Sequence, residues 1–235
     1  MPRVLILVAF ILGLVGLWWL VLPRGESQRS YPLPPFSQVY VADGVWARVT
    51  TNAPPRVEAQ VIRGDIENLN VVVRGQRLEI TVNQADGFWG PWASNRYQVE
   101  IRLPNLSAIE ADSDASVEVI SPVVGAISAS ANAGSKLLLP EVIGTDVILS
   151  ASDGGAVTAA GVCGRLTASA SLDGRVQAMA LECNEVQAKA SIDGGIEVYA
   201  LRQADLSAIG GVIEFSGPTS EITTKTLAEG RITRR

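Results

Sequence analysis

Cys163 and Cys183 are the two cysteines of the sequence, and they lie twenty residues apart. In a stack of twenty-residue coils they would occupy the same position of neighbouring coils, with Cα atoms about 4.8 Å apart, a separation that permits a disulfide. Closing a loop of this length stabilises a fold by about 3 kcal/mol in the chain-entropy model. The alternative is two buried free thiols. Export of the chain, argued below, favours the disulfide.

Three carboxylates recur at the same interval, Asp153, Asp173 and Asp193, and each is followed by glycine. They would form a ladder on the outer face of a stack. A calcium site would require several of their oxygens to converge on one point. Asp-Gly is also a sequence typical of tight turns, because aspartate bonds its own backbone and glycine tolerates positive φ. We therefore predict a ladder of solvated turn residues without a metal or cofactor.

Catalytic chemistry has few candidate groups. The sequence contains no histidine, which excludes histidine bases, Ser-His-Asp nucleophiles and histidine-ligated metals. A polysaccharide lyase would use Ca²⁺ with an arginine base such as Arg165 or Arg175, but it would need long loops to wall a cleft. Coils of twenty residues have none to spare. The sequence favours a non-enzymatic protein, with a carbohydrate-active envelope enzyme as the weakest alternative.

An aromatic loop is the best candidate binding segment. Phe88, Trp89 and Trp92 lie between two predicted strands, where polar turn residues are usual. Exposed, they would stack on sugar rings or touch a membrane interface. Folded back, they would form a hydrophobic lid over one end of the stack. The sequence leaves both readings open.

The N-terminal segment predicts a membrane anchor, residues 1–24. Its core, residues 4–22, carries no charge and no proline, and as a helix it would span about 28 Å, the thickness of the hydrocarbon layer. Trp18 and Trp19 stand where an interfacial aromatic belt would lie. A cleaved signal peptide is the alternative, but no small-residue cleavage site follows the core. Both readings export the rest of the chain, past a stiff Pro-rich spacer over residues 25–35.

The remaining chain must supply the stack that positions these groups. From about residue 106 to 235, apolar and polar residues alternate with period two, which indicates strands. A twenty-residue period joins the strands, so each repeat is one coil of a single-stranded parallel β-helix. The predicted columns of equivalent residues are Leu166, Val186 and Leu206; Ala168, Ala188 and Ala208; and Leu172, Ile192 and Val212.

Two regions depart from this rhythm. Residues 36–105 predict strands over 36–41, 45–51, 56–61, 70–74, 77–82 and 97–103, as irregular first coils or a capping sheet. Apolar residues of the 127–139 coil fall on odd positions, which predicts a one-residue bulge near Gly154 or Gly155. The same registry turns five apolar residues outward, as a face covered by the C-terminal segment or as a homo-oligomer or partner surface: Met179, Tyr199, Ile209, Ile213 and Phe215.

The chain resembles the head GIN domain family, bacterial envelope proteins known as putative auto-transporter adhesins. The resemblance spans about residues 36–232 and is carried by three segments: Phe36-Ser-Gln-Val-Tyr-Val-Ala-Asp-Gly-Val-Trp-Ala-Arg-Val, Val71-Val-Val-Arg-Gly-Gln-Arg-Leu-Glu-Ile, and the run from Val99 to Val119. It implies a right-handed β-helix outside the cytoplasm and carries over no catalytic residue. The family's usual Gly-rich finish is here Thr226-Leu-Ala-Glu-Gly-Arg-Ile, so the final coil differs.

The combined prediction is a non-enzymatic protein of the bacterial cell envelope, all-β after one transmembrane helix, acting in adhesion or scaffolding through a flat face of its β-helix. The alternative is a glycan-binding module centred on the aromatic loop. Expected partners are the membrane, through residues 4–22, and an envelope protein, a glycan or a second copy of the chain. A net charge of −5 gives no electrostatic basis for binding nucleic acid.

Overall fold

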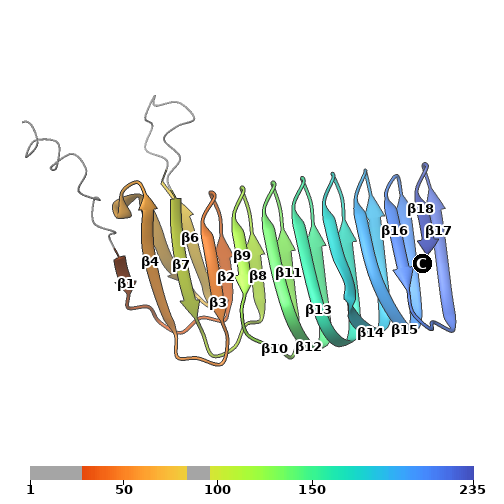
Figure 1. Ribbon diagram of the computed structural model, residues 1–235, viewed down its shortest axis with the longest axis horizontal. Coiled ribbons are helices and arrows are strands. Elements are labelled where there is room, and N and C mark those ends of the chain that lie inside the picture. The colour runs from red at the N-terminus through yellow and green to blue at the C-terminus, as the bar shows by residue number, and fades with distance from the viewer. Residues whose placement is uncertain (1–27, 84–95) are drawn as a thin grey trace, which may run out of the picture.

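The structure is a computed structural model that describes residues 28–83 and 96–235. Its strands form one continuous 18-stranded sheet, wound so that successive coils stack along one axis (Figure 1). The one helix in these residues is the short 3-10 helix η1 (Ile66–Asn68). No helix within the described part of the chain is long and apolar enough to cross a membrane. The predicted transmembrane helix over residues 4–22 lies outside the described residues.

The strands follow one another in the order β1 (Gln28–Tyr31), β2 (Gln38–Val41), β3 (Trp46–Thr50), β4 (Arg56–Arg63), β5 (Leu69–Arg74), β6 (Arg77–Val82), β7 (Arg96–Arg102), β8 (Ala108–Ala111), β9 (Ser116–Val119), β10 (Val123–Val124), β11 (Ile127–Ala131), β12 (Lys136–Ala151), β13 (Ala156–Ala170), β14 (Arg175–Ser191), β15 (Gly195–Ile209), β16 (Val212–Ser216), β17 (Glu221–Leu227) and β18 (Arg231–Arg234).

The regular part of the stack is a parallel β-solenoid of about six coils between residues 106 and 219. β12, β13, β14 and β15 pair in parallel, each with the next in chain order. Their side chains alternate between the interior and solvent, and the interior is filled by Val, Leu, Ile and Ala. Small residues suit this interior because a coil of about twenty residues encloses a narrow core. The predicted all-β stack of parallel coils is confirmed.

A tight turn joins the two strands of each coil, and these turns line up along one edge of the stack (Figure 1). In most coils two successive residues have positive φ, for example Ala133 and Gly134 at 46° and 74°. The amide of Gly134 donates to the carbonyl of Asp153 in the next coil at 2.9 Å, which ties neighbouring turns together. Most of the neighbouring turns are joined through the backbone in this way.

Two apolar residues occupy the same turn edge. Leu172 and Ile192 have φ of 50° and 47° and are 44% and 58% exposed. Their prediction as a strand column with Val212 is wrong. The alternation of apolar and polar residues continues into the turn, but the backbone of Leu172 and Ile192 no longer has a strand conformation.

The coils differ in length, which moves the bulge and changes which residues face inward. Leu139 pairs with Ala159, twenty residues on, whereas Val142 pairs with Gly161, nineteen residues on. The one-residue irregularity therefore lies between Leu139 and Val142, and the prediction of a bulge near Gly154 or Gly155 is wrong. The shift accounts for the change from odd to even buried positions, and Lys136 remains exposed.

The registry changes again towards the C-terminus. Ile196 pairs with Ile213, seventeen residues on, because the chain turns more tightly around Gly210. An odd interval reverses the inward face, so Ile213 and Phe215 are buried and the prediction that they point outward is wrong. Met179, Tyr199 and Ile209 are partly exposed. The β14–β15 registry also pairs Val186 with Ala204 and Ala188 with Leu206, which corrects two of the predicted columns.

Residues 28–105 close the other end of the stack. β2 and β3 form a coil whose strands pair in parallel with β8 and β9 on one side. On the other side β2 pairs with β6 and β3 pairs with β7. β4 then adds antiparallel to β7, β1 adds to β4, and β5 adds to β6. The antiparallel strands β4 and β5 thus cover the outer edges of β7 and β6, at the end of the parallel stack.

Candidate binding faces

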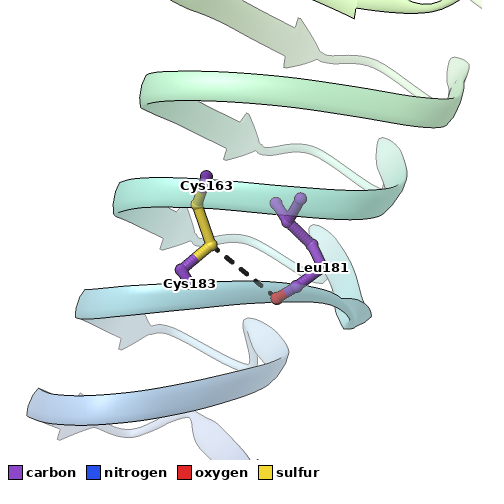
Figure 2. The surroundings of a disulfide bond; sticks show 3 residues. All are labelled: Cys163, Leu181 and Cys183. Carbon is purple, nitrogen blue, oxygen red and sulfur yellow. Dashed lines mark hydrogen bonds between the residues drawn. A yellow bond between two sulfur atoms is a disulfide. The ribbon is translucent and has the colours of Figure 1, made fainter.

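A disulfide joins Cys163 in β13 to Cys183 in β14 (Figure 2). The two Cα atoms are 4.5 Å apart in paired positions of adjacent strands, and both side chains are buried. Cys183 Sγ also lies 3.7 Å from the carbonyl oxygen of Leu181; a disulfide sulfur carries no proton, so this is a packing contact. Oxidised and buried, the pair fastens two coils together and offers no thiolate for chemistry.

The three aspartates of the predicted ladder lie on exposed turns, but they do not form one column. Asp153 occupies the first of the two positive-φ positions of its turn, whereas Asp173 and Asp193 occupy the second. The coil between Gly154 and Asp173 is one residue short, so the twenty-residue spacing in sequence does not correspond to one structural position. No group of three or more potential ligands capable of holding a metal occurs within residues 28–83 and 96–235.

The aromatic loop of Phe88, Trp89 and Trp92 lies outside the described residues, so neither of its two predicted roles is tested. The chain positions it between β6 and β7, which pair in parallel with β2 and β3.

One side of the solenoid presents a flat array of short polar side chains. We call it the hydroxyl face; it comprises outward residues of the strands that precede the tight turns, Ser128, Ser130, Ser150, Thr167, Ser169 and Ser207, and the same rows also contain Ile148, Gln187 and Lys189. Ser150 and Ser169 pair across β12 and β13, and the hydroxyl of Ser169 donates to that of Ser150 at 3.1 Å. Short hydroxyl side chains predominate from β11 to β13, whereas Lys189 of β14 stands between Ser169 and Ser207.

Charged residues border this face. Arg165 contacts Asp146 in the preceding coil at 3.7 Å and Glu185 in the following coil at 3.1 Å. All three side chains are about half exposed or more, so each pair adds at most about 1 kcal/mol. They form a polar border along the hydroxyl face and hold their side chains in register with the coils.

An apolar edge runs along the corner opposite the tight turns, and the sequence interpretation missed it. Val124, Ile143 and Val162 pair in successive coils and are 66%, 47% and 50% exposed. A signal was present, because Val123-Val124-Gly125 and Val142-Ile143-Gly144 lie nineteen residues apart. A search for a twenty-residue period does not align them.

Tyr40 lies within a group of charged residues near the end of the stack that the N-terminal antiparallel strands close; we call this the capped end. Its hydroxyl donates to Asp112 Oδ2 at 3.2 Å, and the guanidinium of Arg77 lies 4.6 Å from the centre of its ring. Arg77 also bonds to Glu110 at 2.8 Å. Burial, reinforced by the charge of Asp112, raises the pKa of Tyr40 to about 12. The phenol is therefore neutral in the folded protein where it would already ionise in the unfolded chain.

Alkaline pH is expected to destabilise the capped end. Because the pKa of Tyr40 is higher in the folded than in the unfolded state, the stabilisation is intact below about pH 10 and is lost as pH rises towards 12. Burial raises the pKa values of Tyr31 and Tyr97 in the same direction. Thermal unfolding between pH 9 and 12 should show a falling midpoint, with a smaller fall for Tyr40→Phe. An equal fall in both proteins would contradict the role of Tyr40.

The chain is similar to a known protein family in sequence and to solved structures in fold. A family model described as "Putative auto-transporter adhesin, head GIN domain" matches residues 35–218. A solved structure described as a putative adhesin from Bacteroides fragilis covers 91% of this chain and 98% of its own, with 15% identity and a TM-score of 0.80. A putative adhesin from Parabacteroides distasonis covers 90% and 97%, with 21% identity and a TM-score of 0.64.

A third structure, described as a putative lipid binding protein from Parabacteroides distasonis, has a TM-score of 0.64 at 13% identity and also covers 90% and 97% of the two chains. At these identities the likeness establishes the fold alone. The comparison with curated proteins gave no match.

Proposed function

Because the chain belongs to the head GIN domain family, whose description is that of an adhesin, we propose that it is a non-enzymatic protein of the bacterial cell envelope. It acts in adhesion or scaffolding through the hydroxyl face of its solenoid, which is right-handed. One transmembrane helix over residues 4–22 holds the solenoid outside the cytoplasm. The apolar length of that segment supports the anchor, and the family supports the envelope location.

The observation that carries the proposal is the regular array of outward hydroxyl groups on the hydroxyl face. Parallel strands hold its side chains about 4.8 Å apart from one coil to the next. The backbone ladder fixes them, so a partner with a flat or repetitive surface loses little of its binding energy in ordering them. Such a face fits recognition of an extended surface better than the enclosure of a small substrate.

The test is retention of bacterial envelope material by the full-length protein. Ser150→Arg/Ser169→Arg places two long charged side chains on the hydroxyl face, and binding is expected to fall at least tenfold. The matched control, Ile143→Arg/Val162→Arg, alters two exposed and paired residues of the same two strands outside the hydroxyl face and should bind as the native protein does. The proposal fails if the first variant binds like the native protein, or if both variants lose binding equally.

A further inference from the structure

Gly195 is a glycine that the fold does not require. Other glycines of the described residues have positive φ, or lie where a Cβ would approach neighbouring atoms within 3.0 Å. Gly195 alone among them has neither feature; the nearest atom to its added Cβ would be Arg175 Cγ at 3.9 Å. Gly195 is the first residue of β15, and a glycine that the backbone does not require costs about 0.5–1 kcal/mol relative to alanine and often marks a place where a ligand approaches the backbone.

A hollow of about 270 Å³ lies over Gly195 on the outside of the solenoid. Three adjacent strands build it: Gly195 of β15 pairs with Arg175 of β14 on one side and with Val212 of β16 on the other. The polar rim consists of Arg175, Gln177, Asp193, Glu197 and Glu214. Because the walls stand on three bonded strands, the hollow is part of the rigid stack.

The rim carries both unused donors and unused acceptors. The side chains of Arg175 and Asp193 make no hydrogen bond or ion pair within residues 28–83 and 96–235. Gln177 Oε1 accepts from the hydroxyl of Thr158 at 3.2 Å, so its amide group remains free to donate into the hollow. Glu197 and Glu214 already pair with Arg235. The free groups are therefore a guanidinium, an amide and a carboxylate.

This mixture selects against charged ligands. Asp193, Glu197 and Glu214 would repel an anion, whereas Arg175, and Arg235 in its pairs with both glutamates, offset much of their attraction for a cation. A sugar hydroxyl both donates and accepts, so a neutral ring can bond to the guanidinium, the amide and the carboxylate at once. The side chain of Val212, beside the uncovered backbone of Gly195, supplies an apolar contact for its C–H face. We propose that the hollow over Gly195 binds one residue of a neutral glycan.

This inference goes beyond the proposed function, because the hollow lies on the strands that follow the tight turns, opposite the hydroxyl face. The full-length protein, kept in a detergent without sugar headgroups, would be titrated calorimetrically with chitotetraose, cellotetraose and mannotetraose. A chitosan tetramer and a heparin tetrasaccharide provide cationic and anionic counterparts. We expect at least one neutral tetrasaccharide to bind. Gly195→Val fills the hollow and should weaken that binding at least tenfold without lowering the melting temperature.

The control is Ala156→Val, which adds bulk two coils away in the same outward column and should leave the affinity unchanged. Arg175→Gln and Asp193→Asn should each weaken binding. The proposal is overturned if no neutral tetrasaccharide binds, if the charged ones bind more tightly, or if Gly195→Val binds like the native protein. Envelope retention by the native protein without tetrasaccharide binding would leave the proposed function standing and reject the glycan site alone.

Discussion

Replacing Cys163 and Cys183 together by alanine is expected to lower the free energy of unfolding by about 3 kcal/mol, the chain-entropy value for a loop of about 20 residues. The residues paired with this position in the flanking coils are Gly144 and Ala200, so alanine fits the column without overpacking. For a chain of this size the loss corresponds to about 6–12 °C in melting temperature. Thermal unfolding followed by circular dichroism measures it.

Reduction provides the matched control for the double substitution. Native protein unfolded in excess dithiothreitol should melt close to the double variant, and the variant itself should be insensitive to the reductant. An unchanged melting temperature of the double variant under oxidising conditions would show that the disulfide adds nothing to the stack. A single cysteine substitution is less informative, because it leaves a free thiol beside the change.

The strand pattern was readable from the sequence because its cause is local. Alternate residues of a strand point to opposite faces, so burial of one face imposes period two wherever the chain is extended. The interval between the cysteines was informative for a similar reason, since the β13–β14 registry at Cys163 is also twenty residues.

The exact number of residues in each coil could not be predicted from the sequence. Intervals of nineteen and seventeen residues arise at corners, where one residue more or less changes the path without breaking the alternation on either side. Ile213 and Phe215 were therefore assigned to the wrong face, and Asp153 was aligned with residues in a different turn position. Repeated Asp-Gly pairs concealed this, because either position of such a turn accepts aspartate or glycine.

The contacts between coils, and not the sequence, determine which glycines the fold requires. Gly194 and Gly195 are adjacent and read as a single turn signal in the sequence. In the structure a Cβ on Gly194 would lie 2.5 Å from the carbonyl carbon of Ala170, whereas a Cβ on Gly195 would have free space. One glycine is required by the neighbouring coil and the other is not, and that difference depends on a residue far away in sequence.

Gly174→Ala should therefore destabilise the protein where Gly195→Ala does not. The Cβ added at Gly174 would overlap the carbonyl oxygen of Ala151 and lie 2.7 Å from the backbone nitrogen of Ser152. Two coils would have to move apart to relieve this overlap, so we expect the free energy of unfolding to fall by about 2–3 kcal/mol, as is typical of overpacking. Gly195→Ala removes the entropic penalty of glycine and should gain about 0.5–1 kcal/mol.

Urea denaturation of the two single variants beside the native protein measures both free energies. Earlier coils carry Ala115 and Ser135 at the position of Gly174, just after the tight turn, so this position accommodates a Cβ in those coils but not at Gly174, where Ala151 lies too close. If Gly174→Ala unfolds within 0.5 kcal/mol of the native protein, the corner can open as it does at Ala115. The distinction between required and unrequired glycines, on which the glycan site depends, would then lose its basis.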